Sequence, residues 1–256
     1  MLSKNQIKYI RSLHQKKFRN ELGLFIAEGP KLTEELLQSN INVKEVYVLA
    51  EALPKFHKNY PSNNPEFFEI SGKDLERISA LKTPNEVVAV VEIPENKSDY
   101  ETIFNQPVLI LDNIQDPGNL GTIIRSADWF GFKNIVCSKD TVEVYNPKVV
   151  QATMGSISRV NVFYFDLKGF LEKAPASYPV YGTLLEGKNI YTSEFNKSGA
   201  IIIGNESKGI GRDIQEFVTE KITILPYKGE RKENAESLNA SVAASLVMAE
   251  FRRQNP

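Results

Sequence analysis

The second half of the chain alternates short apolar runs with helical segments, and this pattern restricts the possible folds more than any other feature. The runs are rich in β-branched and aromatic side chains, and stretches of helical character separate most of them. Such alternation is typical of a parallel sheet that is covered by helices on both faces. The predicted strands are Val108–Leu111, Ile135–Cys137, Val160–Phe165, Val180–Leu185, Ala200–Ile203 and Ile222–Leu225.

A last helix is expected from about Ser237 to Arg253. It would place Val242, Leu246 and Ala249 on one apolar stripe. We therefore expect this stripe to hold the terminal helix against the rest of the domain.

The first part of the chain alternates in the same way and is predicted to form a unit of its own. Its expected helices are Lys4–Phe18, Pro30–Gln38 and Gly72–Leu81, and its expected strands are Leu22–Ala27, Val43–Leu49, Phe67–Ile70 and Val87–Ile93. A polar stretch bounded by prolines follows, which is typical of a linker. The predicted division is residues 1–93, a linker at 94–106 and a second domain at 107–256.

Composition restricts the compartment and the possible cofactors. No apolar run approaches the roughly 20 residues that a membrane-spanning helix needs. The single cysteine, Cys137, lies in a strand-like run, where we expect a buried and inert thiol, and it suits a reducing cytoplasm. Only two histidines, His14 and His57, are present and no Cys/His cluster accompanies them, which argues against a zinc site. No metal is expected.

The net charge of −1 does not indicate a nucleic-acid-binding protein, but the charge is unevenly distributed. Residues 1–20 contain six cations and no acidic side chain. Such a local patch can bind RNA phosphates even on a nearly neutral protein, although a solvated helix face is the simpler alternative. The six residues are Lys4, Lys8, Arg11, Lys16, Lys17 and Arg19.

Three loops that follow predicted strands carry glycine and uncharged polar residues. The first leads from Leu111 into a helix, with Asn119 near the helix start and Arg125 nearly two turns later. Asn119 could cap the helix or hold a ligand. Arg125 lies among apolar neighbours, where an arginine needs a partner or must reach solvent.

The second loop begins at Gly204, directly after an apolar strand, and contains Glu206. The third follows Leu225 and reaches Ser237 and Asn239, both good residues for a helix N-terminus. Open parallel sheets bind ligands at the carboxyl ends of their strands. We therefore expect the three loops to form one shared site.

Several common sites are excluded by their missing motifs. No G-x-x-x-x-G-K-[ST] phosphate loop is present, and no G-x-G-x-x-G follows the first strand of either unit. The serines of the third loop lack a G-x-S-x-G context, and both histidines lie in the other unit. These absences argue against a nucleotide triphosphatase, a dinucleotide enzyme and a serine hydrolase.

Together the three loops resemble the three motifs of the SpoU/TrmH family of RNA ribose methyltransferases, within the SPOUT superfamily. In order they read N…DP.N.G.I.R.A..FG, then an apolar strand ending G.E..G, then I..P…G…ESLN.S.A, across roughly 107–253. The stretch KKFRN…GLFIAEG, from Lys16 to Gly29, is similar to the family's ribosomal-protein-like RNA-binding domain.

The resemblance implies an α/β fold in which a trefoil-knotted parallel-sheet methyltransferase domain follows a small ribosomal-protein-like α/β RNA-binding domain. It also implies a homodimer formed by the C-terminal domain, with S-adenosylmethionine held in the knot. By motif position, the cofactor-binding residues are Thr183, Gly204, Leu225 and Leu238. The catalytic or substrate-side residues are Asn119, Arg125, Glu206, Ser237 and Asn239.

The implied reaction is methyl transfer to a ribose 2′-hydroxyl, a group that only RNA possesses. Arg125 is expected beside the hydroxyl, where it would polarise rather than deprotonate it, because arginine stays protonated. Ribosomal RNA is the favoured substrate. The alternatives are a tRNA ribose methyltransferase, a base methyltransferase and a non-catalytic RNA-binding protein. One departure is the loop from Gly229 to Glu236, which is longer than usual in the family and leaves its own cofactor contacts open.

Overall fold

The computed structural model describes residues 1–60, 65–95, 99–227 and 237–256. The chain forms two compact units. The N-terminal unit comprises Met1–Glu95 together with Glu143–Ser158, and the C-terminal unit comprises Asn96–Val142 together with Arg159–Pro256. Residues 143–158 thus lie within the predicted second domain but pack with the first, a long-range contact that no local sequence pattern announces.

The N-terminal unit contains a four-stranded mixed sheet in the order β1-β4-β2-β3. β4 is antiparallel to both β1 and β2, and β2 is parallel to β3. Its helices are α1 (Lys4–Ser12), α2 (Lys16–Leu22), α3 (Pro30–Leu37), α4 (Leu53–Asn59), α5 (Gly72–Ile78) and α8 (Pro147–Thr153), followed by the short 3-10 helix η1 (Ser156–Ser158). Its strands are β1 (Leu24–Glu28), β2 (Val43–Leu49), β3 (Glu66–Ile70) and β4 (Val87–Glu92).

The first helix is shorter than predicted. A single helix was expected over Lys4–Phe18, but α1 ends at Ser12 and α2 begins at Lys16. The amides of Leu13, His14 and Gln15 each bond the carbonyl three residues earlier, which tightens the last turn, and Gln15 is then extended at φ −103° and ψ 130°. Because of this break, the basic side chains of α2 do not continue the helical face on which those of α1 lie.

The C-terminal unit contains a six-stranded sheet in the order β10-β8-β9-β5-β6-β7, and all its neighbouring strands are parallel. The predicted parallel sheet is confirmed. Its strands are β5 (Pro107–Leu111), β6 (Asn134–Ser138), β7 (Asn161–Phe165), β8 (Val180–Asn189), β9 (Gly199–Ile203) and β10 (Glu220–Thr223). Its helices are α6 (Tyr100–Phe104), α7 (Pro117–Trp129), α9 (Leu167–Leu171), α10 (Arg212–Gln215) and α11 (Ala240–Gln254), with the 3-10 helix η2 (Ile190–Thr192).

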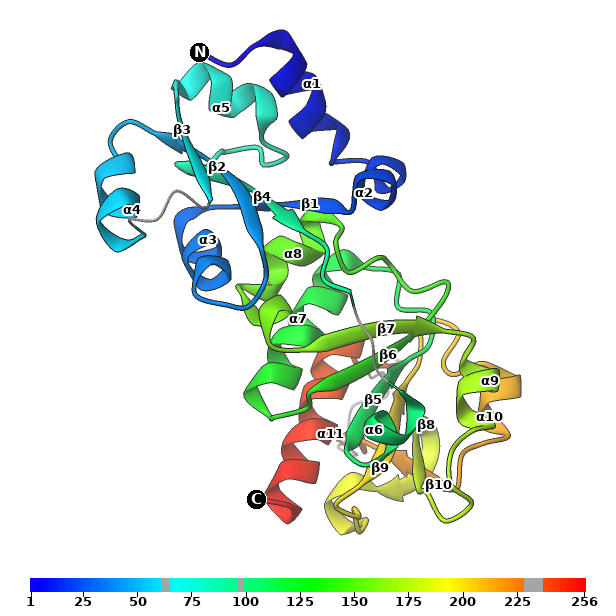
Figure 1. Cartoon of the computed structure of the whole chain (residues 1–256). Helices are drawn as coiled ribbons and strands as arrows, with labels where there is room; N and C mark the ends of the chain where they lie inside the picture. The colour runs from blue at the N-terminus through cyan, green and yellow to red at the C-terminus, as the bar shows by residue number, and fades with distance from the viewer. Residues whose placement is uncertain (61–64, 96–98, 228–236) are drawn as a thin grey trace. The chain divides into compact units, whose positions relative to one another are not determined.

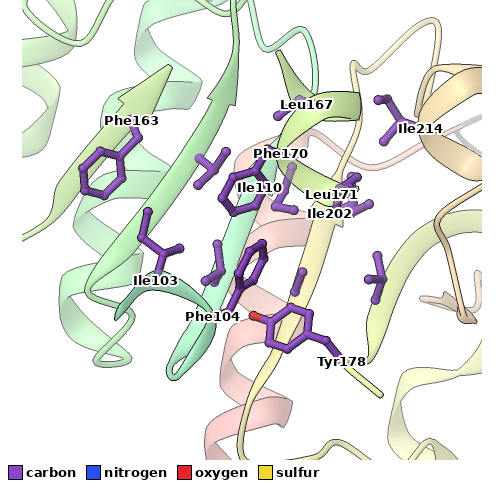
Figure 2. Close-up of a cluster of buried hydrophobic side chains, with 14 of the residues drawn as sticks. Ile103, Phe104, Ile110, Phe163, Leu167, Phe170, Leu171, Tyr178, Ile202 and Ile214 are labelled. Carbon is purple, nitrogen blue, oxygen red and sulfur yellow. The ribbon is translucent and has the colours of Figure 1, made fainter. Parts of the chain in front are cut away.

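Helices cover both faces of this parallel sheet. On one face, side chains of α6, α9 and α10 pack over the central strands, and Figure 2 shows Phe104, Phe170 and Ile214 converging there with Ile110 and Ile202. On the other face α7 and α11 lie side by side (Figure 1), and α11 contacts β9. Burial on both faces explains why the central strands β5, β6 and β9 are mostly apolar rather than alternating.

The predicted linker is partly structured. Asp99 caps α6 by accepting a 2.7 Å hydrogen bond from the Thr102 amide. Ile103 and Phe104, which fall within the predicted linker, are buried in the core of the C-terminal unit. The two residues are too few to produce a periodic pattern, which is why the sequence did not reveal this helix.

The terminal helix does not dock by the predicted stripe. Val242 is 46% exposed, whereas the buried side of α11 carries Ala244, Val247, Met248 and Phe251. Phe251 packs edge to face on Phe132, with ring centroids 5.1 Å apart. The stripe of Val242, Leu246 and Ala249 is therefore not the face that anchors the helix within its own chain.

Cys137 lies in β6 and is fully buried, as predicted, and burial raises the pKa of its thiol. A protonated, inaccessible thiol is unreactive. Among the described helices, none combines the length and the apolarity needed to cross a membrane.

Candidate active site

The first residues of α7 are fixed by their own sequence. Asp116 is the N-cap and accepts a 2.8 Å hydrogen bond from the backbone amide of Asn119, while Pro117 occupies the first turn. With its backbone held in this way, Asn119 extends its side chain from the first turn of α7, at the carboxyl end of β5. Capping was one of the two alternatives for Asn119, and Asp116 supplies the cap instead, so the side-chain amide of Asn119 can bond other partners.

Side chains of the three loops meet at Asn119. Its amide nitrogen donates to the Glu206 carboxylate, and its oxygen accepts a 2.9 Å hydrogen bond from the Asn239 amide. Asn239 in turn is the N-cap of α11, because its oxygen accepts the amides of Ser241 and Val242 at 3.0 and 3.3 Å. The structure therefore joins three predicted residues, Glu206, Asn119 and Asn239, in one chain of hydrogen bonds.

Ser237 reaches the same place more weakly. Its hydroxyl donates to the Glu206 carbonyl at 3.5 Å, the limit of a hydrogen bond, and the residue is exposed. α11 begins at Ala240, so the predicted helix start at Ser237 is three residues early.

The loop after β9 is closed by its own backbone. Asn205 and Gly209 exchange backbone hydrogen bonds of 3.1 and 2.8 Å, and the Asn205 side chain accepts the amides of Ser207 and Lys208. A Cβ on Gly204 would lie 2.3 Å from the Gly209 carbonyl carbon. The structure therefore requires glycine at position 204 for the chain's own tight turn.

Two carboxylates that are absent from the predicted site hold these loops in place. Asp112 follows β5 and accepts a 2.7 Å hydrogen bond from the Gly211 amide, at the far end of the second loop. Burial raises the pKa of Asp112, and Asp213 and Asp140 raise it further. The second carboxylate is Asp116, which caps α7. An Asp-Pro pair at a helix start is the sequence signal for this capping role.

Arg125 stands apart from this network. It lies on α7 and is exposed, and no hydrogen bond or ion pair connects its guanidinium to any residue that the structure describes. An exposed and unengaged guanidinium remains available for a charged or hydroxyl-bearing ligand.

The expected cofactor residues lie in or next to β8, β9, β10 and α11. Thr183 lies within β8, directly after the residues that pair with β9, and donates a 2.7 Å hydrogen bond to the carbonyl of Ile202 on β9, two residues before Gly204. Leu225 follows β10 and Leu238 precedes α11, and they are 51% and 45% exposed. Large apolar side chains exposed beside a polar site are suited to cover a flat ring. The residues from Gly229 to Glu236, which form the unusually long loop, lie outside the described ranges.

Comparison with known proteins decides the family. A model of the SpoU rRNA Methylase family matches residues 106–249, more than half of the chain, and a model of the MRM3-like substrate binding domain matches residues 4–89. The chain belongs to the SpoU rRNA methylase family. The predicted family is thus confirmed, and with it an RNA methyltransferase that uses S-adenosylmethionine.

Relatives resemble this SpoU-family chain over its whole length. The 23S rRNA (guanosine(2553)-2'-O)-methyltransferase RlmP of Bacillus subtilis is 32% identical and aligns over 98% of this chain and 97% of its own. A TrmH-family protein from Porphyromonas gingivalis has 33% identity and a TM-score of 0.84, covering 99% of both chains. An AdoMet-bound rRNA methyltransferase from Sinorhizobium meliloti has 28% identity and a TM-score of 0.83, covering 99% and 96%.

The substrate-binding domain of this SpoU-family protein corrects one predicted RNA contact. Lys4, Lys8, Arg11, Lys16 and Lys17 are exposed, but Arg19 is 2% exposed. The Arg19 guanidinium forms an ion pair with Glu143 and donates a 2.9 Å hydrogen bond to the Leu13 carbonyl. Arg19 is therefore engaged inside the N-terminal unit and is not part of a surface that phosphates can reach.

Proposed function

We propose that this protein transfers a methyl group from S-adenosylmethionine to a ribose 2′-hydroxyl of structured ribosomal RNA. The observation that carries the proposal is the hydrogen-bonded meeting of Glu206, Asn119 and Asn239, one from each motif, in a member of an rRNA methylase family. The RlmP relative acts on a ribose 2′-oxygen of 23S rRNA, which favours ribosomal RNA over tRNA.

The residues present fit the cofactor. The exposed Leu225 and Leu238 offer apolar surface for a purine ring, and the backbone around Thr183 in β8 and Gly204 after β9 offers peptide groups on adjacent strands. When bound, S-adenosylmethionine supplies an already activated methyl group, so that the protein needs no metal to make the carbon electrophilic. In the described part of the chain, no group of three or more metal-ligating side chains is placed to hold an ion.

The chain's own residues would then orient and polarise the ribose. Arg125 is proposed to bind the 2′-hydroxyl or a neighbouring phosphate, because a guanidinium can donate to both at once. The Glu206–Asn119–Asn239 network would hold the nucleotide in line with the methyl group. Such alignment alone accounts for about 7–11 kcal/mol of barrier reduction in favourable cases.

We further propose that the chain passes through a trefoil knot. β10 lies at the edge of the sheet, while α11 begins beside Asn119 at the end of β5, and β8 and β9 separate the two strands. The end of β10 and the start of α11 therefore lie on opposite sides of β8 and β9, an arrangement that supports the knotted path of the family.

A homodimer is the assembly that we propose. Trp129 on α7 and Val242 on α11 are 85% and 46% exposed, and the two helices pack together within the chain. An apolar face on paired helices is suited to a second copy of the same chain. Asn119 is already engaged by Glu206 and Asn239 of its own chain, so Arg125 is the residue to be shared between subunits.

The exposed cations of α1 and α2 are proposed to bind RNA phosphates. They lie in the part of the chain that matches the substrate binding domain model. A ribosomal RNA substrate would place the protein in the cytoplasm.

The test is methylation mapping of ribosomal and transfer RNA from cells with and without this protein. The proposal predicts the loss of one or more ribose methyl groups from ribosomal RNA. Loss from tRNA alone would identify a tRNA enzyme instead. An unchanged ribose pattern in both RNAs, with a changed base methylation, would contradict the ribose assignment.

A further inference from the structure

Arg19 belongs to the basic N-terminal stretch by sequence, but its contacts connect it to a distant part of the chain. Its Nε donates to Glu143 Oε1 at 3.2 Å and its Nη2 donates to Oε2, so the guanidinium binds the carboxylate in a bidentate manner. The third contact is the Leu13 carbonyl. Arg19 is 2% and Glu143 13% exposed. A bidentate pair shielded from water fixes both partners in position.

Glu143 opens the segment 143–158, which packs as part of the N-terminal unit. Tyr145 stacks at a tilt on Phe25 of β1, with ring centroids 4.8 Å apart. The helix α8 contacts β1 (Figure 1), and Gly155 packs so closely on Glu35 that an added Cβ would lie 2.9 Å from the Glu35 side chain. The N-terminal unit thus holds this segment along its whole length, beginning at the ion pair.

The residues just before Glu143 are held by the C-terminal unit. We refer to residues 138–142 as the linking segment. The Thr141 hydroxyl accepts the Ile114 amide at 3.2 Å and donates to the Leu111 carbonyl at 3.3 Å. The Val142 amide donates to the Ile114 carbonyl at 2.8 Å, and the Ser138 hydroxyl accepts the Asn113 amide at 2.9 Å.

The partner of the linking segment is the loop that builds the active site. Residues 111–116 lead from β5 into α7, and Asp116 at their end caps the turn that presents Asn119. The Asn113 carbonyl also accepts a 2.9 Å hydrogen bond from Asn205, the neighbour of Glu206. The position of this loop therefore affects both Asn119 and the loop of Glu206.

We propose that Arg19 is a positioning residue for methyl transfer. By fixing Glu143, it holds one end of the linking segment, and the linking segment holds the 111–116 loop in the arrangement that joins Asn119 to Glu206. Because Arg19 lies in α2 beside the exposed Lys16 and Lys17, RNA bound to those cations would act on the same helix. The role in methyl transfer rests on the proposed function. The structural connection from Arg19 through Glu143 to the 111–116 loop does not depend on that function.

The first experiment needs neither RNA nor cofactor. Hydrogen–deuterium exchange is followed in peptides that cover 111–119, whose Asn113 and Ile114 amides bond the linking segment. In Glu143→Gln, which keeps the shape of the side chain and removes its charge, we expect exchange in these peptides to accelerate by at least about threefold. The matched control is Lys44→Gln, which removes an exposed ion pair with Glu92 in the same unit and should leave 111–119 unchanged.

The second experiment measures single-turnover methylation of the substrate RNA. Glu143→Gln should lower the methyl-transfer rate roughly 2- to 30-fold, the range of effects seen along coupled networks, with RNA and cofactor affinity retained. Thr141→Val removes the hydroxyl that bonds Ile114 and keeps the side-chain volume. If both residues act through the same loop, the double variant should lose little more than the worse single variant.

Arg19→Lys keeps the charge but lacks the fork, and it replaces Glu143→Gln in both experiments if that variant does not fold. Exchange that rises only in peptides of the N-terminal unit and leaves 111–119 at the wild-type rate would overturn the proposal. So would fully additive losses in the double variant. Faster exchange at 111–119 in a protein whose wild type methylates no ribose would count against the proposed function, while the structural connection from Arg19 to the 111–116 loop would stand.

Discussion

The side-chain amide of Asn239 donates a 2.9 Å hydrogen bond to the side-chain oxygen of Asn119, although 120 residues separate them. The Asn239 oxygen caps α11 by accepting the amides of Ser241 and Val242. One side chain thus starts a helix with its oxygen and holds the site with its nitrogen. The two roles can be separated by substitution.

Asn239→Asp is predicted to keep the helix cap and to lose the site. Aspartate caps as well as asparagine, so the free energy of unfolding should stay within about 0.5 kcal/mol of wild type. It cannot donate to Asn119, and it adds a second carboxylate to the network that contains Glu206, so methylation should fall by up to about a hundredfold. Asn239→Ala, the companion variant, should also lose about 0.5–2 kcal/mol of stability. Thermal melts and single-turnover rates separate the two effects. An Asp variant with wild-type turnover would show that Asn239 only caps the helix and does not act in the site.

Arg125→Ala is predicted to remove most turnover without affecting stability. The side chain is exposed and unengaged by the described residues, so its loss should change the free energy of unfolding by no more than about 0.5 kcal/mol. Affinity for S-adenosylmethionine should be retained, because the proposed contact of Arg125 is with the ribose or a phosphate and not with the cofactor. Lysine should rescue poorly. The matched control is Thr122→Ala, an exposed residue on the same helix. Near wild-type turnover in Arg125→Ala would mean that Glu206 or a group of the substrate, and not Arg125, assists the 2′-hydroxyl.

Neutralising the exposed cations of the N-terminal unit is predicted to weaken RNA binding and its salt dependence. The five changes to Gln are at Lys4, Lys8, Arg11, Lys16 and Lys17. For every phosphate that is no longer neutralised, the slope of log affinity against log salt should become shallower by roughly 0.7–0.9. Filter binding across a salt series measures this slope.

The control for this patch removes exposed lysines from the other unit, at Lys168, Lys197 and Lys221. Their loss should leave the slope close to wild type. Equal effects from both sets would mean that binding follows net charge alone. Arg19 is left out of the set because it is buried against Glu143.

The sequence was most informative where a motif is local. Asn119 and Glu206 follow β5 and β9, and Asn239 ends the loop that follows β10. The carboxyl ends of parallel strands lie at one edge, so the meeting of these residues was predictable. The apolar runs predicted the sheet because strands buried on both faces need no alternation.

The errors occurred where long-range packing decides. Arg19 was counted with its basic neighbours because sequence does not reveal that Glu143 faces it. The predicted stripe of α11 is wrong because it favours large apolar residues such as Val242 over Ala244, although the small residue lies in the buried face. The spacing and the type of the apolar residues do not show which of two apolar faces of a helix is buried against its own chain.

His14 is predicted to make the protein less stable as the pH falls. Its ring is half-buried, and burial lowers its pKa, while the Nε2 atom lies 3.0 Å from the Ile78 carbonyl. A histidine with a lowered pKa binds its proton more readily in the unfolded chain, so stability is present above the unfolded pKa of about 6.5 and declines below it. Urea unfolding at pH 7, 6 and 5 should show the decline, and His14→Gln should flatten it. His57→Gln, at an exposed position, is the control and should not.

The dimer prediction can be joined to Arg125 in one experiment. The exposed apolar side chains Trp129 and Val242 lie on α7 and α11, and α7 also carries Arg125. A partner packed on these helices would be brought close to Arg125. We therefore predict that Arg125 acts in the site of the partner subunit, whereas Asn239 acts in the site of its own chain.

Mixing two inactive variants distinguishes the two arrangements. When Arg125→Ala and Asn239→Ala subunits are unfolded together and refolded, half of the dimers should be mixed. In a mixed dimer one site receives an intact Asn239 from its own chain and an intact Arg125 from the partner, while the other site lacks both. If Arg125 is shared, activity should return to roughly a quarter of the wild-type value, since one site in two works in half of the dimers. If Arg125 serves its own chain, each site of the mixed dimer lacks one residue and no activity returns. A protein that sediments as a monomer at micromolar concentration and is fully active would contradict the dimer prediction itself.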